Sequence, residues 1–289
     1  MTLVERRVGN AAVSLRSMLT GERASITAQT SATLTTYIDE IVASGLPGIR
    51  QAAPAARDLL LDGYVDRIVE HDFPEVGHVV RRPATLRRWL AAYAAATATT
   101  ASYDSIRDAA TSGEGDKPAK TTTQPYRDVL ERLWILDPVT AWAPTRSRLR
   151  RLAGAPKHHL ADVALGVRLL GLDNESILRD GSLLGRLFES MVTLDVRVYG
   201  QSARATVHHL RERGGNREID LIVEGADNRI VAIEVKLSAT VSDRDVQHLH
   251  WLRDKVGDQL ADAVVITTGR DAYRRADGIA VVPAALLGP

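Results

Sequence analysis

The sequence predicts an α+β protein whose helices come first and whose strands come last. The chain has 289 residues, 45% hydrophobic and 25% charged, so it is globular and long enough for two domains. Apolar residues recur at helical spacing through most of residues 31–134. Beyond residue 181 the pattern becomes one helix, three strands, a second helix and a further strand. This order is αβββαβ.

Composition narrows the class of protein further. The formal net charge is +1, which gives no global attraction to nucleic acid. The chain has no cysteine, which excludes disulfides, thiol catalysis and zinc ribbons. No stretch resembles a signal peptide or a span of about 18 apolar residues. We therefore expect a soluble, cytoplasmic protein without a membrane partner.

Residues 1–76 are expected to form a helical segment. Ser31–Gly45 reads as one helix, which Gly45 would cap, and Ala55–Phe73 reads as a second amphipathic helix. The Gly45–Gly48 stretch is the turn between them. In Met1–Leu19 the apolar residues show no strong periodicity.

Three helices and a strand are expected between residues 77 and 150. The helices cover 84–97, 103–110 and 120–134, and Val139–Trp142 reads as a strand. This order fits a winged helix, in which Lys120–Leu133 would be the recognition helix that enters a DNA groove.

A basic run overlaps this region. From Lys120 to Lys157 there are eight Lys or Arg residues against three Asp or Glu. Such a run can neutralise phosphates, and affinity for DNA would then fall steeply with salt. A solvated loop between domains is the alternative. The predicted DNA-contacting residues are Lys120, Arg127, Arg146, Arg148, Arg150 and Arg151.

Residues 151–289 are expected to form the αβββαβ domain. Its first helix, Gly181–Leu194, turns Leu184, Leu187 and Phe188 inward and leaves Glu189 at the edge of that stripe. The elements that follow are strands at 205–210, 217–223 and 230–236, a helix at 242–255, and strands at 263–268 and 278–282.

Three charges are embedded in the apolar hairpin of this domain: Asp220, Glu234 and Lys236. Glu234 and Lys236 are two residues apart and share one strand face, whereas Ile233 and Val235 share the other, which is expected to be core. Carboxylate oxygens hold Mg²⁺, and a lysine can orient the attacking water and stabilise phosphoryl charge. The arrangement resembles the PD-(D/E)XK nuclease motif. A solvated strand face is the alternative.

The register of the hairpin tests this interpretation. A symmetric four-residue loop at 225–228 would place Asp220 opposite Ile233 rather than Glu234. A shared metal site therefore requires an odd loop or a bulge, and Gly225 would permit either.

An ordered set of short motifs extends the resemblance over most of the chain. The motifs are Tyr37–Ile41, Gly45–Gly48, Tyr64–Asp72, Lys157–Asp162, Gly185–Glu189, Glu218–Asp220 and Glu234–Lys236. Together they look like the carboxy-terminal two thirds of prokaryotic AAA-type ATPases that carry a C-terminal domain of unknown function. In that family an ATPase module, a winged helix and a nuclease-like domain follow one another.

The resemblance implies roles for individual residues. Asp220 and Glu234 would ligate Mg²⁺ or Mn²⁺, with Glu189 as outer support, and Lys236 would orient the water. On the following helix Gln247 matches a position that approaches the site in related nucleases, but Trp251 replaces the usual tyrosine four residues later. That departure weakens a nucleic-acid contact there.

The nucleotide-binding core of that family has no counterpart in this sequence. There is no Gly-x-x-x-x-Gly-Lys-Ser/Thr, and the first 76 residues resemble only the lid that follows the core. We therefore expect no ATP hydrolysis by this chain alone and interpret it as a fragment or a truncated gene product. The expected partners are DNA and a separate ATPase chain or a second copy of itself.

Histidines give weaker candidates for a metal site. His158 and Asp162 would share one face if their segment were helical, but such a group is more typical of a helix start with polar neighbours. His208 and His209 alternate faces on a strand. His248 and His250 lie roughly 200° apart on a helix.

Two classes of function follow from these patterns. The first is a metal-dependent nuclease-like enzyme that the winged helix brings to DNA. The second is a non-catalytic regulatory module that binds DNA or protein, in which Asp220, Glu234 and Lys236 form a structural ion network.

Overall fold

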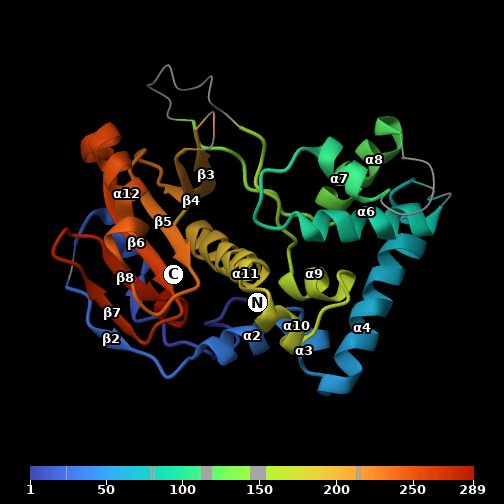
Figure 1. Cartoon of the computed structure of the whole chain (residues 1–289), viewed down its shortest axis with the longest axis horizontal. Helices are drawn as coiled ribbons and strands as arrows, with labels where there is room; N and C mark the ends of the chain where they lie inside the picture. Colours follow the sequence, from blue (N-terminus) through green and yellow to red (C-terminus); the bar gives the residue numbers. More distant parts are fainter. Residues whose placement is uncertain are drawn as a thin grey trace. The chain divides into compact units, whose positions relative to one another are not determined.

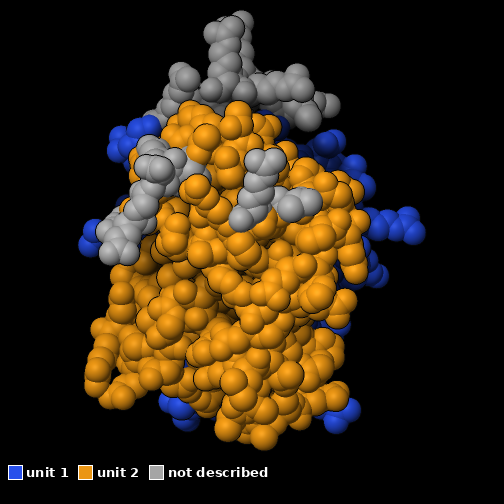
Figure 2. All heavy atoms as spheres, turned by 90° about the vertical axis from the view of Figure 1, so that its right-hand side faces the viewer, with its two compact units in different colours: residues 1–38, 139–156, 191–289 blue, residues 39–138, 157–190 orange. Residues whose placement is uncertain are grey.

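The computed structural model describes residues 1–23, 25–78, 80, 82–111, 119–143, 154–212, 214 and 216–289. The chain folds into two compact units, which alternate along the sequence. We call residues 1–38, 139–156 and 191–289 the sheet unit, and residues 39–138 and 157–190 the helical unit. Figure 2 distinguishes them by colour. These units do not follow the predicted boundaries at 76 and 150, and the division into three domains stays a prediction.

The predicted order αβββαβ is confirmed, and with it the α+β class. The elements are α11 (Gly181–Ser202), β3 (Thr206–Arg211), β4 (Glu218–Glu224), β5 (Ile230–Lys236), α12 (Asp243–Val256) and β6 (Leu260–Thr267). The residues predicted to face inward on α11, Leu184, Leu187 and Phe188, are all buried, and so is Met191.

Seven strands among the described residues form one mixed sheet, in the order β2-β7-β8-β6-β5-β4-β3. Strands β3, β4 and β5 pair antiparallel, whereas β6 runs parallel to both β5 and β8. The parallel pairing of β5 with β6 follows from the crossover through α12 (Figure 1), whereas β6 and β8 are parallel because β7 lies between them along the chain and runs antiparallel to β8. Strand β7 covers Asp271–Arg274 and β8 covers Ala280–Pro283.

The interior strand β5 is buried on both faces, which corrects one expectation. Residues 230–235 are all buried, so Glu234 does not lie on an open strand face. The reason is α12: its Val246, Leu249 and Leu252 join the same core cluster as Ile230 and Ala232, on the face of β5 that carries Glu234. A strand covered on both faces loses the alternation of exposed and buried residues.

The amino-terminal residues complete the sheet unit, which the sequence did not predict. Strand β2 (Ala28–Gln29) pairs with β7 at the sheet edge. Strand β1 (Val13–Ser14) pairs with β9 (Leu287–Gly288), and the short helix α1 (Leu15–Thr20) follows β1. Further upstream, the backbone N–H of Leu3 donates to the buried carboxylate of Asp195, at 3.2 and 3.3 Å from its two oxygens.

The helical unit confirms most of the predicted helices. It contains the end of α2 (Leu34–Val42) and the start of α11, and between them α3 (Pro47–Arg50), α4 (Pro54–Arg67), the π-helical turn Ile68–Asp72, α5 (Phe73–Glu75), α6 (Pro83–Ala95), α7 (Tyr103–Ala109), α8 (Lys120–Arg132), α9 (Val163–Leu169) and α10 (Asn174–Arg179). Aromatic rings fill the core of this unit. The ring centroid of Tyr126 lies 6.1 Å from that of Phe73 and 6.4 Å from that of Trp89.

The three helices expected between residues 77 and 150 are α6, α7 and α8, but the strand expected at Val139–Trp142 is absent. Within the described part of that region only isolated bridges occur, and Ala141 pairs with His209 of β3. A four-residue apolar run does not suffice for a strand when no neighbour continues the ladder. The winged-helix assignment stays a prediction.

Candidate functional site

The turn between β4 and β5 has an odd length, as a shared site requires. Leu221 pairs with Ile233 and Glu224 pairs with Ile230, so the connection contains five residues, 225–229. The backbone N–H of Gly225 donates to the carbonyl of Arg229 at 2.9 Å and closes this loop. Continued by one residue, the register brings Asp220 opposite Glu234, on the same face of the sheet.

Asp220 is fixed at the point where the β4–β5 ladder ends. Its Oδ2 accepts the backbone N–H of Val235 at 2.9 Å, across the strand pair. The side chain therefore stands in for a main-chain acceptor, and its carboxylate is held beside the Glu234-Val235-Lys236 segment.

Glu234 and Lys236 form the charged centre of the site. Glu234 is only 4% exposed, and its Oε2 accepts from Nζ of Lys236 at 2.8 Å. The Lys236 side chain is one-third exposed. Burial lowers the pKa of Lys236, but the carboxylates of Glu234 and Asp220 outweigh this effect and raise its pKa above the ordinary value. Lys236 is thus held as an ammonium.

The amino-terminal turns of α12 add two residues, Asp245 and His248, that the sequence analysis did not connect with the hairpin. Asp245 forms a capping box with Ser242. Burial raises its pKa, but the hydrogen bonds from Ser242 and the positive charge of Lys236 outweigh this, and the net pKa is lowered. His248 Nδ1 lies 2.8 Å from the carbonyl oxygen of Glu218 and 4.0 Å from Oε1 of Glu234. The Ser-x-x-Asp pattern could have marked the helix start, but not its proximity to Lys236.

We call Asp220, Glu234, Lys236, Asp245 and His248 the hairpin cluster. It holds three carboxylates, one ammonium and one imidazole, so with a neutral imidazole the cluster carries a net negative charge. Across the described parts of the chain, no group of three or more His, Asp or Glu side chains is already placed to hold a metal ion. Asp220 and Glu234 are a pair of carboxylates whose strands place them opposite each other.

The fourth predicted catalytic residue, Glu189, forms an ion pair within the helical unit. Its Oε1 accepts from Nζ of Lys157 at 2.8 Å, and the Lys157 side chain is 1% exposed. This is a buried ion pair between α11 and the segment that precedes α9.

The predicted DNA-contacting residues that are described take part in ion pairs. Lys120 Nζ lies 2.9 Å from Asp104. Arg127 lies 2.9 Å from Asp128 and 4.9 Å above the ring centroid of Tyr103. These pairs reduce the positive charge that α8 presents. Four further predicted contacts lie outside the described residues: Arg146, Arg148, Arg150 and Arg151.

The histidine pair at 158–159 is a packing feature rather than a helical metal site. The segment is not helical; His158 lies 5.0 Å from the rings of both Tyr93 and Tyr103, and burial lowers its pKa. His159 Nδ1 lies 3.1 Å from the Ser190 hydroxyl. Asp162 caps α9 through the N–H of Ala164.

Trp251, which replaces the tyrosine expected in nucleases, lies under a charged side chain. The guanidinium carbon of Arg217 is 4.9 Å from the centroid of its ring. Gln247, one turn earlier on α12, is exposed.

The fold and the hairpin cluster define an α+β protein with a carboxylate-rich site at the end of a β-hairpin. Residues 184–287, which include this cluster, match the family described as Domain of unknown function (DUF4143). Residues 34–176 match a second family, Domain of unknown function (DUF8612).

Two curated mycobacterial proteins resemble the chain. They are the uncharacterized protein Mb2031c of Mycobacterium bovis and the uncharacterized protein Rv2008c of Mycobacterium tuberculosis, each 29% identical over 229 residues. The alignment covers 77% of this chain and 47% of each relative, so the chain spans about half the length of the curated relatives it matches. No solved structure matches the chain. None of the described helices is long and apolar enough to cross a membrane.

Proposed function

We propose that the hairpin cluster is a metal-dependent phosphodiesterase site of the nuclease type, and that its substrate is DNA. The observation that carries the proposal is the register of the hairpin, which brings Asp220 opposite Glu234 next to Lys236. Two carboxylates and a lysine in this order resemble the PD-(D/E)XK nuclease motif.

The two carboxylates fit a divalent cation. Mg²⁺ binds through one or two carboxylates and keeps several waters, so Asp220 and Glu234 suffice as protein ligands when a substrate phosphate supplies further oxygens. A bound Mg²⁺ or Mn²⁺ would polarise a phosphoryl oxygen and favour the deprotonation of a water.

The other side chains of the cluster position the reactants. Lys236, held as an ammonium, stabilises negative charge that develops on the phosphoryl group and orients the attacking water. Asp245 keeps α12 capped beside Lys236, and His248 anchors the first turns of this helix to the Glu218 carbonyl. Glu189, as outer support of the metal, belongs to the same proposal.

A wider assignment accompanies this one. We propose that the chain derives from an AAA-type ATPase and acts with DNA, a separate ATPase chain or a second copy of itself, without binding ATP. The ordered motifs from Tyr37 to Lys236 support this, as does the match of residues 184–287 to a domain of unknown function.

Calorimetric titration with Mg²⁺ and Mn²⁺, with cleavage assays on labelled single-stranded, duplex and branched DNA, tests the proposal. Wild type should bind metal and cut, Asp220→Asn should lose both, and Glu234→Ala should lose cleavage. Glu175→Gln is the matched control, because it also removes one carboxylate charge but lies exposed in the helical unit. Wild-type protein that neither binds metal nor cuts DNA would exclude the enzyme.

A non-catalytic regulatory module is the second candidate, and a specific observation favours it. The three charged side chains of the hairpin already have partners within the chain: Lys236 donates to Glu234 at 2.8 Å, and Asp220 accepts the N–H of Val235 at 2.9 Å. In such a module these contacts would stabilise the hairpin. Asp220→Asn would then lower the free energy of unfolding without changing metal binding.

A further inference from the structure

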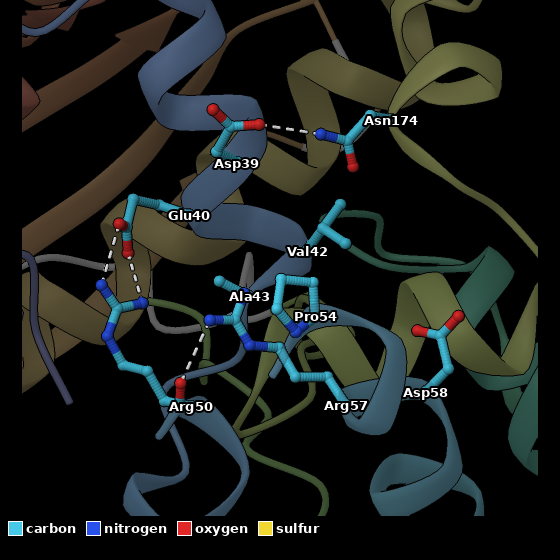
Figure 3. A pocket seen from close by; sticks show the side chains of 9 residues that line it. All are labelled: Asp39, Glu40, Val42, Ala43, Arg50, Pro54, Arg57, Asp58 and Asn174. Atoms are coloured by element: carbon cyan, nitrogen blue, oxygen red, sulfur yellow. Dashed lines mark hydrogen bonds and ion pairs between the residues drawn. The ribbon is translucent and has the colours of Figure 1, made fainter. Parts of the chain in front are cut away.

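An open cavity of about 490 Å³ lies at the surface of the helical unit, formed by the end of α2, the last residue of α3, the start of α4 and the first residue of α10. Figure 3 shows the side chains that line it. This volume is typical of sites for small molecules or for the end of a peptide. The lining combines both signs of charge with aliphatic surface, and the charges differ in how fully the chain itself satisfies them.

One ion pair of the lining is internally complete. The guanidinium of Arg50 donates to both carboxylate oxygens of Glu40, at 2.7 and 2.9 Å. Such a bidentate pair is fixed in geometry and electrically neutral. It forms a wall of the cavity rather than a contact for a charged ligand.

Asp39 and Asn174 present acceptors. Asn174 Nδ2 donates to Asp39 Oδ1 at 2.8 Å, which leaves the second oxygen of Asp39 and the amide oxygen of Asn174 as acceptors. The partner of Asp39 in this bond is a neutral amide, so the charge of the carboxylate is not compensated by it. The carboxy-terminal end of α2, with its partial negative charge, lies at the same place. An ammonium group, with three donors and a positive charge, fits these acceptors.

Arg57 presents donors with the opposite charge. Its Nε and Nη2 each donate to a backbone carbonyl, of Ala52 and Arg50 respectively, both at 3.2 Å. These neutral acceptors orient the guanidinium. Among the described residues no carboxylate forms an ion pair with it; Asp58, which also lines the cavity, pairs instead with Arg168 at 3.7 Å. The remaining N–H groups of Arg57 fit a carboxylate.

Aliphatic side chains lie between these two polar ends. Figure 3 shows Val42, Ala43 and Pro54 between the Asp39–Asn174 pair and the guanidinium of Arg57. A ligand that reaches both ends must therefore carry apolar atoms between its charges.

We propose that this cavity binds a zwitterion in which a primary ammonium and a carboxylate are separated by a short aliphatic segment. The ammonium binds Asp39 and Asn174, and the carboxylate binds Arg57. A lysine residue with a free carboxyl group has this chemistry, either as the free amino acid or as the last residue of a polypeptide.

Calorimetric titration of the full chain with four probes tests the proposal: L-lysine, alanyl-lysine, lysine amide and norleucine. Lysine amide lacks the carboxylate and norleucine lacks the side-chain ammonium, so each should bind at least tenfold more weakly than L-lysine. Equal binding of L-lysine and alanyl-lysine identifies a chain end as a ligand, whereas binding of L-lysine alone identifies a free amino acid.

Variants locate the two ends of the ligand. Asp39→Asn should weaken binding of L-lysine at least tenfold and remove the difference between L-lysine and norleucine. Arg57→Gln should remove the difference between L-lysine and lysine amide. Glu175→Gln, a matched loss of charge on an exposed side chain next to Asn174, should leave affinity unchanged.

Titrations of the wild-type protein with the four probes can refute the proposal by themselves, so the test does not depend on whether a variant folds. Absence of binding at millimolar lysine would refute the site. Equal affinity for L-lysine, lysine amide and norleucine would refute the recognition of two charged ends.

Discussion

Two lysine–glutamate pairs with the same 2.8 Å contact differ in which partner is buried. In Lys157–Glu189 of the helical unit the lysine side chain is 1% exposed and the glutamate 13%. In Lys236–Glu234 of the sheet unit the lysine is 33% exposed and the glutamate 5%. The first ammonium depends on its carboxylate because water cannot reach it, whereas the second is partly hydrated. Distance alone therefore does not tell a structural pair from one whose lysine can serve a substrate.

The largest effect is expected at the pair with the buried lysine. Glu189→Leu removes a carboxylate that lies 2.8 Å from the buried Lys157 ammonium and should lower the free energy of unfolding by about 3–5 kcal/mol, as when other buried ion pairs lose one partner. Urea denaturation measures this. The double variant Lys157→Met, Glu189→Leu should recover most of the loss, because no buried charge remains. A loss below about 1 kcal/mol for Glu189→Leu would contradict the structural role of this pair.

Asp195 extends the comparison to a buried carboxylate whose hydrogen bond comes from a neutral donor, the N–H of Leu3. Burial raises the pKa of Asp195 from 3.8 to about 7. The native state therefore keeps a proton that the unfolded chain releases above about pH 4. The contribution of Asp195 to the free energy of unfolding is therefore fully present below about pH 4. It is lost as the pH rises to about 7, and the total loss is at most about 4 kcal/mol.

Urea denaturation at pH 4.5 and pH 8 measures this loss. Asp195→Asn carries no titratable proton, so its stability relative to wild type should rise with pH. A difference between variant and wild type that stays the same at the two pH values would show that Asp195 titrates normally.

The αβββαβ order was predictable because its strands are apolar runs with clear breaks, and both helices show the 3.6-residue period. The two-residue strands β1, β2 and β9 are too short to carry any period, so the sequence did not reveal that residues 1–38 complete the sheet unit.

The candidate site was predictable in its residues but not in its geometry. Asp220, Glu234 and Lys236 were visible as charges within apolar strands. Their register depends on a five-residue loop, which the sequence permits but does not dictate. The partner of Glu189 is 32 positions away, and no local pattern connects Lys157 with it.

A smaller effect is expected at the partly exposed lysine. Lys236→Met should lower the free energy of unfolding by about 1 kcal/mol, because water screens the pair and a lysine that is one-third exposed was never fully desolvated. Denaturation in urea beside Glu189→Leu gives the comparison directly. If Lys236→Met lowered the free energy of unfolding as much as Glu189→Leu, exposure of the lysine would not distinguish the two pairs. The hairpin cluster would then be a structural network.

The smallest effect is expected at a pair that is exposed on both sides. Glu175 and Arg179 lie one turn apart on α10, with side chains 73% and 75% exposed. Glu175→Gln should change the free energy of unfolding by less than about 0.5 kcal/mol, since both charges stay hydrated in either state. In 1 M salt even this difference should vanish, because the Debye length falls to about 3 Å and exposed charges are then strongly screened. A larger and salt-resistant loss would mean that exposure does not rank these pairs, and the contrast between Lys157 and Lys236 would then need another cause.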